Sequence, residues 1–320
     1  MKIGVFTALW GNLPFEEALD KAVKFGVQAV EIGAGGYPGC PHCPVDELLE
    51  SQTKREEWLG KIKDRGLSLS ALSIHNEPLH PNQEIAAEAD RVIRNAIKLA
   101  ALLGVPTING FPGLPGGAKG DTMPNWVTCA WPPHFLDILD YQWNEVAIPY
   151  WKKIHDVLEE NNVTLGFEMH PGMLIYNVYT LLRMREATGP RLGCNFDPSH
   201  LWWNGVDPVA AIRALGDAIF HVHGKDVYID VHNTQVNGCN DYKHYGDIPN
   251  RSWTFRALGY GHDLKEWKDI ISALRMVGYD YVISIEHEDA MMSPDEGLDK
   301  GIATLKEAVI FEKAGEMFWA

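Results

Sequence analysis

The chain has 320 residues, of which 46% are hydrophobic, so it can bury a substantial core without disulfide or metal staples. Acidic residues outnumber basic ones by 43 to 28, and the formal net charge of −15 opposes binding to nucleic acid or to an anionic membrane surface. The five cysteines are an odd number, and no basic and apolar leader opens the chain. No apolar run reaches the roughly 20 residues of a membrane helix. We therefore expect a reduced cytoplasmic protein.

Short β-branched runs alternate along the chain with longer segments of helical periodicity, and this alternation is typical of parallel βα units. Eight runs are predicted to form strands, at residues 3–9, 29–33, 69–75, 107–111, 164–170, 192–197, 219–223 and 281–287. Amphipathic segments with capping signals lie between them, at residues 14–26, 84–103 and 263–277.

Eight strands alternating with seven or eight helices favour an α/β fold of the closed (β/α)8 TIM barrel type, with an open, doubly wound sheet as the alternative. Two intervals are too long for plain loops, namely residues 112–149 after the fourth strand and 227–262 after the seventh. Because these insertions are rich in aromatic residues, we expect them to be ordered lids. No internal repeat or domain boundary is visible, so residues 1–320 are predicted to form a single domain.

Chemically active side chains stand at matching depth at the ends of the last four predicted strands. The segments are GFEMHPG, NFDPSH, HVHGKD and SIEHED, and the residues are Glu168, Asp197, His223 and Glu286. If the barrel closes, these four side chains converge on its axis. Three carboxylates and one imidazole form an oxygen-rich set that suits Mn²⁺, with Mg²⁺ or Co²⁺ as alternatives and Zn²⁺ less favoured. The sequence therefore predicts a site for one divalent cation.

The chain resembles the xylose-isomerase-like barrel superfamily, in particular the sugar phosphate isomerase/epimerase group with its D-tagatose 3-epimerases, inosose isomerases and dehydratases, and C-glycoside deglycosidase large subunits. The resemblance covers nearly the whole chain and rests on IGVFTALWG, AVEIG, EMHPG, FDPSH, HVHGKD, LGYGHD and SIEHED. It implies that the four strand-end residues bind one metal, that His200 contacts substrate, and that Glu168 and Glu286 also move the proton. It also implies a homo-oligomer.

The residue types suit proton abstraction beside a carbonyl. A divalent ion chelated by the carbonyl and a neighbouring hydroxyl of a keto-sugar stabilises the enediolate that forms when the α-proton leaves. One carboxylate can take that proton and a second can return it on the opposite face. We therefore predict a metal-dependent sugar isomerase or epimerase with catalytic Glu168 and Glu286. His170 is a second candidate base, with an ordinary pKa of about 6.5.

The main alternative is a lyase that shares the metal and the first proton transfer. Proton loss beside the ketone of a 3-oxo-glycoside can expel a group at the β position, as in the C-glycoside deglycosidases. Some of these enzymes work with a small partner subunit. Inosose dehydration expels water in the same way. His170 would then be the preferred base.

Apurinic endonucleases of the superfamily are disfavoured by the net charge and by the lack of a histidine in residues 107–111. A sugar-binding barrel with a structural metal is disfavoured because four ligands leave coordination positions free for substrate.

Further residues are predicted to contact the substrate. They are His75 and Glu31 at the third and second strands, Asp226 just past the seventh, and Arg256 and Trp131 in the two insertions. An arginine can meet a substrate phosphate or carboxylate, and an aromatic side chain can wall a sugar or an aglycone. Each has an ordinary alternative, as a packing residue, a cap or a solvated loop residue.

Overall fold

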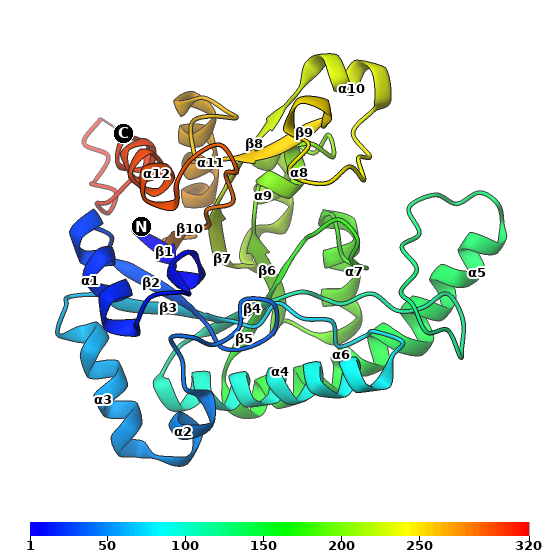
Figure 1. Ribbon diagram of the computed structural model, residues 1–320, viewed down its shortest axis with the longest axis horizontal. Helices are drawn as coiled ribbons and strands as arrows, with labels where there is room; N and C mark the ends of the chain where they lie inside the picture. Colours follow the sequence, from blue (N-terminus) through cyan, green and yellow to red (C-terminus); the bar gives the residue numbers. More distant parts are fainter. Residues whose placement is uncertain (320) are drawn as a thin grey trace.

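A computed structural model describes residues 1–319 of the chain, and in it eight parallel strands close into a barrel (Figure 1). Their order around the barrel is β1-β10-β7-β6-β5-β4-β3-β2. The strands are β1 (Lys2–Phe6), β2 (Ala29–Gly33), β3 (Ser68–Ser73), β4 (Thr107–Gly110), β5 (Thr164–Glu168), β6 (Leu192–Phe196), β7 (Ile219–Gly224) and β10 (Val282–Ile285). The predicted (β/α)8 barrel is confirmed, and the open sheet is excluded.

Helices follow the barrel strands and pack around them. They are α1 (Phe15–Phe25), α2 (Val45–Glu50), α3 (Gln52–Lys63), α4 (Gln83–Leu103), α6 (Ile148–Asn161), α7 (Val178–Thr188), α8 (Ser199–Trp202), α9 (Pro208–Leu215), α11 (Leu264–Met276) and α12 (Pro294–Ala308). Short 3-10 turns are η1 (Thr7–Trp10) and η3 (Gly216–Ala218). The predicted helices at residues 14–26, 84–103 and 263–277 correspond to α1, α4 and α11.

Local capping explains where these helices begin and end. Gly26 and Gly104 close α1 and α4 with φ of 76° and 70°, in the left-handed region that glycine adopts without steric penalty. At the start of α11, the Asp263 carboxylate accepts the backbone N–H of Glu266. The chain can thus turn from each helix back to the barrel within a few residues.

The barrel strands separate an apolar layer from a polar interior. In β6, Cys194 and Phe196 belong to the hydrophobic core, whereas Asn195 between them joins a buried polar network. In β7, Val222 lies in the same core, between two buried histidines, His221 and His223. This period of two carries polar side chains into the barrel, and it positions the chemistry described below.

The two insertions contain elements of their own. The one after β4 holds α5 (His134–Asp140) and a π-helix, η2 (Tyr141–Ala147), which runs into α6. The one after β7 holds β8 (Asp226–Ile229), α10 (Val231–Asn237), η4 (Ile248–Asn250) and β9 (Trp253–Arg256), with β8 and β9 paired antiparallel. Figure 1 shows α5 and α10 projecting from the barrel at separate edges. Within residues 1–319, no helix has the length and apolarity that a bilayer crossing requires.

Candidate active site

The carboxyl ends of four barrel strands bring Glu168, Asp197, His223 and Glu286 together. Glu168 is the last residue of β5, Asp197 and Glu286 directly follow β6 and β10, and His223 lies in β7. One potential ligand atom from each residue lies within 4.8 Å of the others. The side chain of Glu286 is 16% exposed and the other three residues are buried. We call this group the four-residue cluster.

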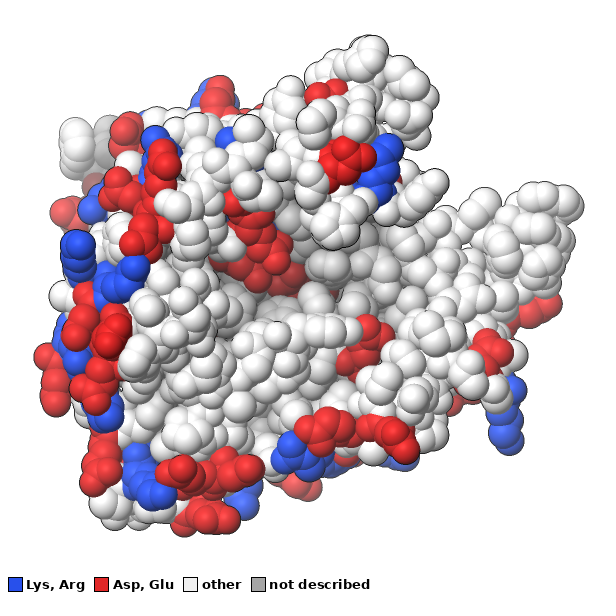
Figure 2. All heavy atoms as spheres, viewed as in Figure 1, with Lys and Arg blue, Asp and Glu red and all other residues white. Residues whose placement is uncertain are grey.

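The imidazole of His223 contacts two carboxylates of the four-residue cluster. Its Nδ1 atom is 3.1 Å from Oε2 of Glu168 and 3.3 Å from Oε2 of Glu286. On the face seen in Figure 2, acidic side chains line a hollow near the middle of the molecule. Three carboxylates and one imidazole nitrogen that converge at this spacing are a donor set that fits a divalent cation with a preference for oxygen ligands.

The two glutamates stay ionised despite their burial. Burial raises the pKa of Glu168, but the imidazoles of His75, His200 and His223 lower it by more than burial raises it. The pKa of Glu168 therefore lies well below its usual value. For Glu286, burial is likewise outweighed by the charges of Lys225 and His223, which bring its pKa to about 2. Both side chains therefore carry negative charge at neutral pH, as a cation site requires.

Lys225, to which the sequence pattern gave no role, lies inside this group of carboxylates. Its side chain is 2% exposed, and Nζ lies 2.6 Å from Glu286, 3.1 Å from Asp197 and 3.1 Å from Glu288. Burial lowers the pKa of Lys225, but these carboxylates raise it well above the usual value. Since an ammonium group has three N–H donors, each can meet one carboxylate, and Lys225 holds two members of the four-residue cluster in place.

Two predicted substrate contacts, His75 and His200, lie against Glu168. Nε2 of His75 is 3.1 Å from Oε2 of Glu168, and Nε2 of His200 is 3.0 Å from Oε1. The amide of Asn195 also donates to Oε2, at 3.3 Å. These contacts fix the direction of the Glu168 carboxylate.

His170 lies beside this group and packs against other aromatic rings. Its ring centroid is 4.3 Å from that of His200 and 4.8 Å from that of Phe111. Nδ1 donates to the carbonyl oxygen of Pro171 at 2.7 Å, so Nε2 is the nitrogen with the free lone pair. Burial, and then the charge of His200, lower the pKa of His170 to about 3. The ring is therefore neutral at physiological pH.

Asp226 is used within the protein. Oδ2 accepts the backbone N–H groups of Gly259, Gly261 and His262 at 3.0–3.1 Å, and Oδ1 lies 2.8 Å from Nδ1 of His262. A Cβ at Gly261 would collide with the carbonyl of Val227. Asp226 thus ties β8 to the LGYGHD segment. The sequence, in which Asp226 simply follows Lys225, did not indicate this role.

The two predicted insertion residues have their contacts elsewhere. Arg256, in β9, donates from Nε to Oδ2 of Asp289 at 2.8 Å. Trp131, in the insertion after β4, is 72% exposed. Glu31, in β2, contacts Nε2 of His223, the ring nitrogen opposite the one that faces Glu168 and Glu286. Substrate contact by these residues stays a prediction.

A barrel with an acidic, histidine-containing cluster at the carboxyl ends of its strands defines a class, the enzyme-like (β/α)8 barrels. Within that class, residues 19–308 match the family model described as "Xylose isomerase-like TIM barrel", and the chain belongs to this family.

Two relatives and one solved structure show what the chain is similar to. The chain is 42% identical over 312 residues to "Uncharacterized protein YfiH" of Bacillus subtilis (strain 168), a match that spans 97% of this chain and 99% of that one. It is 25% identical over 155 residues to an inosose dehydratase of Geobacillus thermodenitrificans (strain NG80-2), over 48% and 50% of the two chains. A crystal structure of a D-tagatose 3-epimerase-like protein superposes with a TM-score of 0.63 at 22% identity, over 96% and 97% of the chains, which shows the shared fold.

Proposed function

We propose that the protein is a divalent-metal-dependent isomerase or epimerase of keto-sugars, which removes a proton from the carbon next to a carbonyl. The observation that carries the proposal is the convergence of three carboxylates and one ring nitrogen of His223 within 4.8 Å, at the end of the barrel where such enzymes act. The similarity to sugar-converting relatives supports it. We also propose that the protein is a cytoplasmic homo-oligomer, as the family resemblance implies.

The four-residue cluster would hold one divalent ion, Mn²⁺ in first place with Mg²⁺ or Co²⁺ as alternatives and Zn²⁺ less favoured. When bound, the ion supplies Lewis acidity at the oxygens of the substrate and stabilises the enediolate charge. Glu168 and Glu286 reach the cluster from β5 and β10, on either side of β6 and β7. One of these carboxylates can therefore take the proton and the other can return it to the opposite face. His75 and His200 orient Glu168 for this transfer.

A lyase is the second candidate, and two observations favour it. The inosose dehydratase to which the chain is similar is named for the loss of water, and His170 presents a neutral ring whose Nε2 is free to accept a proton. In this version the same proton leaves, and a β-positioned hydroxyl or aglycone departs from an inosose or a 3-oxo-glycoside. A small partner subunit would accompany the protein if it resembles the deglycosidases.

NMR in D₂O tests the proposal and separates it from the second candidate. Mn²⁺-loaded and chelated protein would be incubated with ketoses, inososes and 3-oxo-glycosides. Metal-dependent deuterium uptake into a rearranged sugar is the expected result. Release of water or an aglycone would instead establish the lyase, and no exchange with any substrate of the panel would contradict both.

The substitution E286Q is the sharpest mutational test, because it keeps the shape of a side chain that both ligates and moves a proton. We expect turnover to fall by about 10³-fold. E288Q is the matched control, because Glu288 shares the contact with Lys225, is 47% exposed and lies outside the four-residue cluster. Equal activity of E286Q and the wild type, both folded as judged by circular dichroism, would refute the mechanism.

A further inference from the structure

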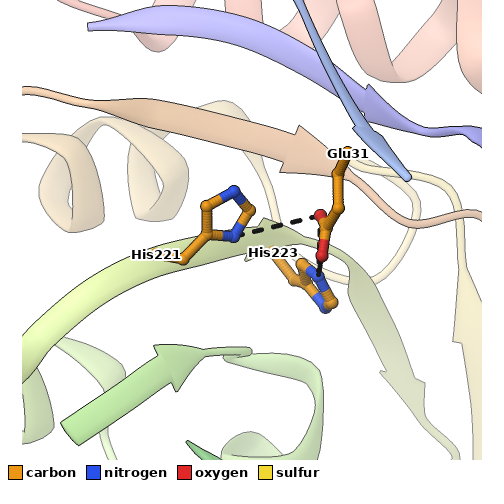
Figure 3. Close-up of side chains that lie close together, drawn as sticks. All are labelled: Glu31, His221 and His223. Atoms are coloured by element: carbon orange, nitrogen blue, oxygen red, sulfur yellow. Dashed lines mark hydrogen bonds and ion pairs between the residues drawn. The ribbon is translucent and has the colours of Figure 1, made fainter. Parts of the chain in front are cut away.

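The two ring nitrogens of His223 face different carboxylates. Nδ1 points to Glu168 and Glu286, the residues of the four-residue cluster. Nε2, on the opposite side of the ring, is 3.1 Å from both Oε1 and Oε2 of Glu31 (Figure 3). The proposed metal site has no other histidine, so the direction in which this ring presents its lone pair decides whether the site is complete.

Glu31 is itself held in place by neighbouring strands. It is fully buried in β2, Ser73 of β3 donates its hydroxyl to Oε1, and the amide of Asn109 in β4 donates to the same oxygen at 2.8 Å. A buried carboxylate accepts hydrogen bonds and offers none, so it needs such donors. With two of them supplied from β3 and β4, the carboxylate is left in one orientation towards His223.

The second histidine of β7 provides an internal contrast. His221 precedes His223 by two residues and points the same way, but its ring contacts neutral groups. Nδ1 lies 3.2 Å from Oδ1 of Asn195 and 3.1 Å from Nδ2 of Asn109, and Nε2 lies 3.3 Å from Oγ of Ser70. Its nearest approach to Glu31 is 3.9 Å. Of the two rings, only that of His223 has a carboxylate within hydrogen-bond distance on each side.

We infer that Glu31 is a positioning residue, which fixes the tautomer and the orientation of His223 so that Nδ1 is the nitrogen offered to a cation. Carboxylates lie on both sides of the ring, so a cation bound on the side of Glu168 and Glu286 requires Nδ1 to give up its hydrogen, and the contact with Glu31 keeps the remaining ring hydrogen on Nε2. A carboxylate behind a ligating histidine also makes the imidazole a stronger donor to the metal. This inference rests on the proposed metal site, and it gives Glu31 a role other than substrate contact.

A competing use of the same residues is a second cation site. Single ligand atoms of Glu31, His221 and His223 also lie within 4.8 Å of one another. Against it, Oε1 of Glu31 already accepts from Ser73 and Asn109, and both nitrogens of His221 lie within hydrogen-bond distance of neutral partners. The ratio of ions to protein decides between the two uses.

The experiment is a titration of metal-free protein with Mn²⁺, followed by the EPR signal of the free ion. We expect the wild type to bind one ion and E31Q to bind one ion with a dissociation constant about 10- to 100-fold higher. The visible absorption spectrum of Co²⁺-saturated E31Q should differ from that of the wild type, because it reports the geometry around the ion. A change in stability alone would move neither measurement.

Two serines of β3 give a matched pair of variants if E31Q does not fold. Ser73 contacts Glu31, whereas Ser70 contacts His221 and the carbonyl of Val30. We expect S73A to weaken Mn²⁺ binding by about threefold to tenfold and S70A to leave it unchanged. Unchanged affinity in E31Q and S73A would overturn the inference, as would two ions in the wild type and one in E31Q. A wild type that binds no ion would instead refute the metal site itself.

Discussion

The two long insertions differ in how they meet the candidate site. The insertion after β7 forms a small core in which its Val227, Trp253 and Phe255 pack with Trp203, the residue that follows α8. Phe255 reaches from this core to the site, with its ring 5.3 Å from that of His200 and 4.8 Å from Nζ of Lys225. Asp226 ties the first strand of the insertion to the segment that leads into α11. This insertion is therefore part of the wall of the site.

The insertion after β4 differs in where its buried side chains lie. Its helix α5 has no buried residue, whereas Leu114 and Val127 before that helix and Gln142 and Trp143 after it, in η2, are buried. It meets the site at its first residue, where Phe111 packs against His170. Both insertions are rich in aromatic residues, so the comparison teaches that the location of the buried side chains, rather than aromatic content, decides whether an insertion shapes the site.

The largest effect on stability is expected at Asp226, which connects the insertion after β7 to the segment before α11. D226N replaces a buried carboxylate by an amide whose N–H₂ group faces the backbone donors of Gly259, Gly261 and His262. We expect the free energy of unfolding to fall by about 3 kcal/mol, because removing one member of a buried charged contact leaves its partners unsatisfied. Urea unfolding followed by tryptophan fluorescence measures this change.

Asp263 provides the matched control for that variant. D263N changes the neighbouring acid at the N-terminus of α11, where asparagine caps a helix as well as aspartate does. We expect a change within about 0.5 kcal/mol. If D226N and D263N unfolded at the same urea concentration, Asp226 would not be the residue that ties the insertion to the barrel.

A smaller effect is expected for His170, on the side of the β4 insertion. Because its pKa is lowered to about 3, the ring stays neutral between pH 5 and 7, whereas an ordinary histidine gains a proton below about 6.5. We expect H170N to reduce turnover by less than about 10²-fold, and its rate relative to the wild type to be constant over this pH range. Steady-state rates at pH 5, 6 and 7 test both points.

A larger loss in H170N would favour the lyase. A loss of about 10³-fold or more would make His170 the base, and the ratio to the wild type would again be constant between pH 5 and 7 because the ring is neutral over this range. That result would also bring the start of the β4 insertion into the chemistry, since Phe111 holds the ring of His170.

The smallest effect is expected at the tip of the β4 insertion. W131A removes a side chain that is 72% exposed, and we expect stability to change by no more than about 0.5 kcal/mol and turnover by less than about twofold. The matched variant in the other insertion, W253A, removes a buried tryptophan and should destabilise by about 3 kcal/mol or more. Thermal unfolding compares the two, and a large loss in W131A would show that the β4 insertion closes on the site.

The sequence could predict those parts of the fold and site that follow from local pattern. The barrel is predicted by a hydrophobic period of two in the strands and a helical period between them. A carboxylate at the end of a strand, such as Glu168 or Asp197, is visible in the sequence as part of a motif. Contacts between distant parts of the chain were not accessible in this way. Arg256 and Asp289 meet only because the barrel closes, and no spacing rule links them.

Neighbouring residues past the end of β7 show a second reason. Lys225 and Asp226 are adjacent and both charged, yet one points into the four-residue cluster and the other into the β7 insertion. The difference depends on how β8 leaves the barrel. Glu31 is a third case, because the sequence placed it near the pocket without showing that it faces the second nitrogen of His223.

The ammonium group of Lys225 has a consequence for the order of assembly. Three carboxylates converging without a cation would repel one another, and the chain supplies a permanent positive charge among them. We therefore expect the barrel to complete its folding before any ion arrives, unlike small zinc domains that are unfolded until they are loaded. The protein could then take up, lose and replace its ion while native, so that the ions available in the cell, rather than the folding pathway, would determine which one it carries.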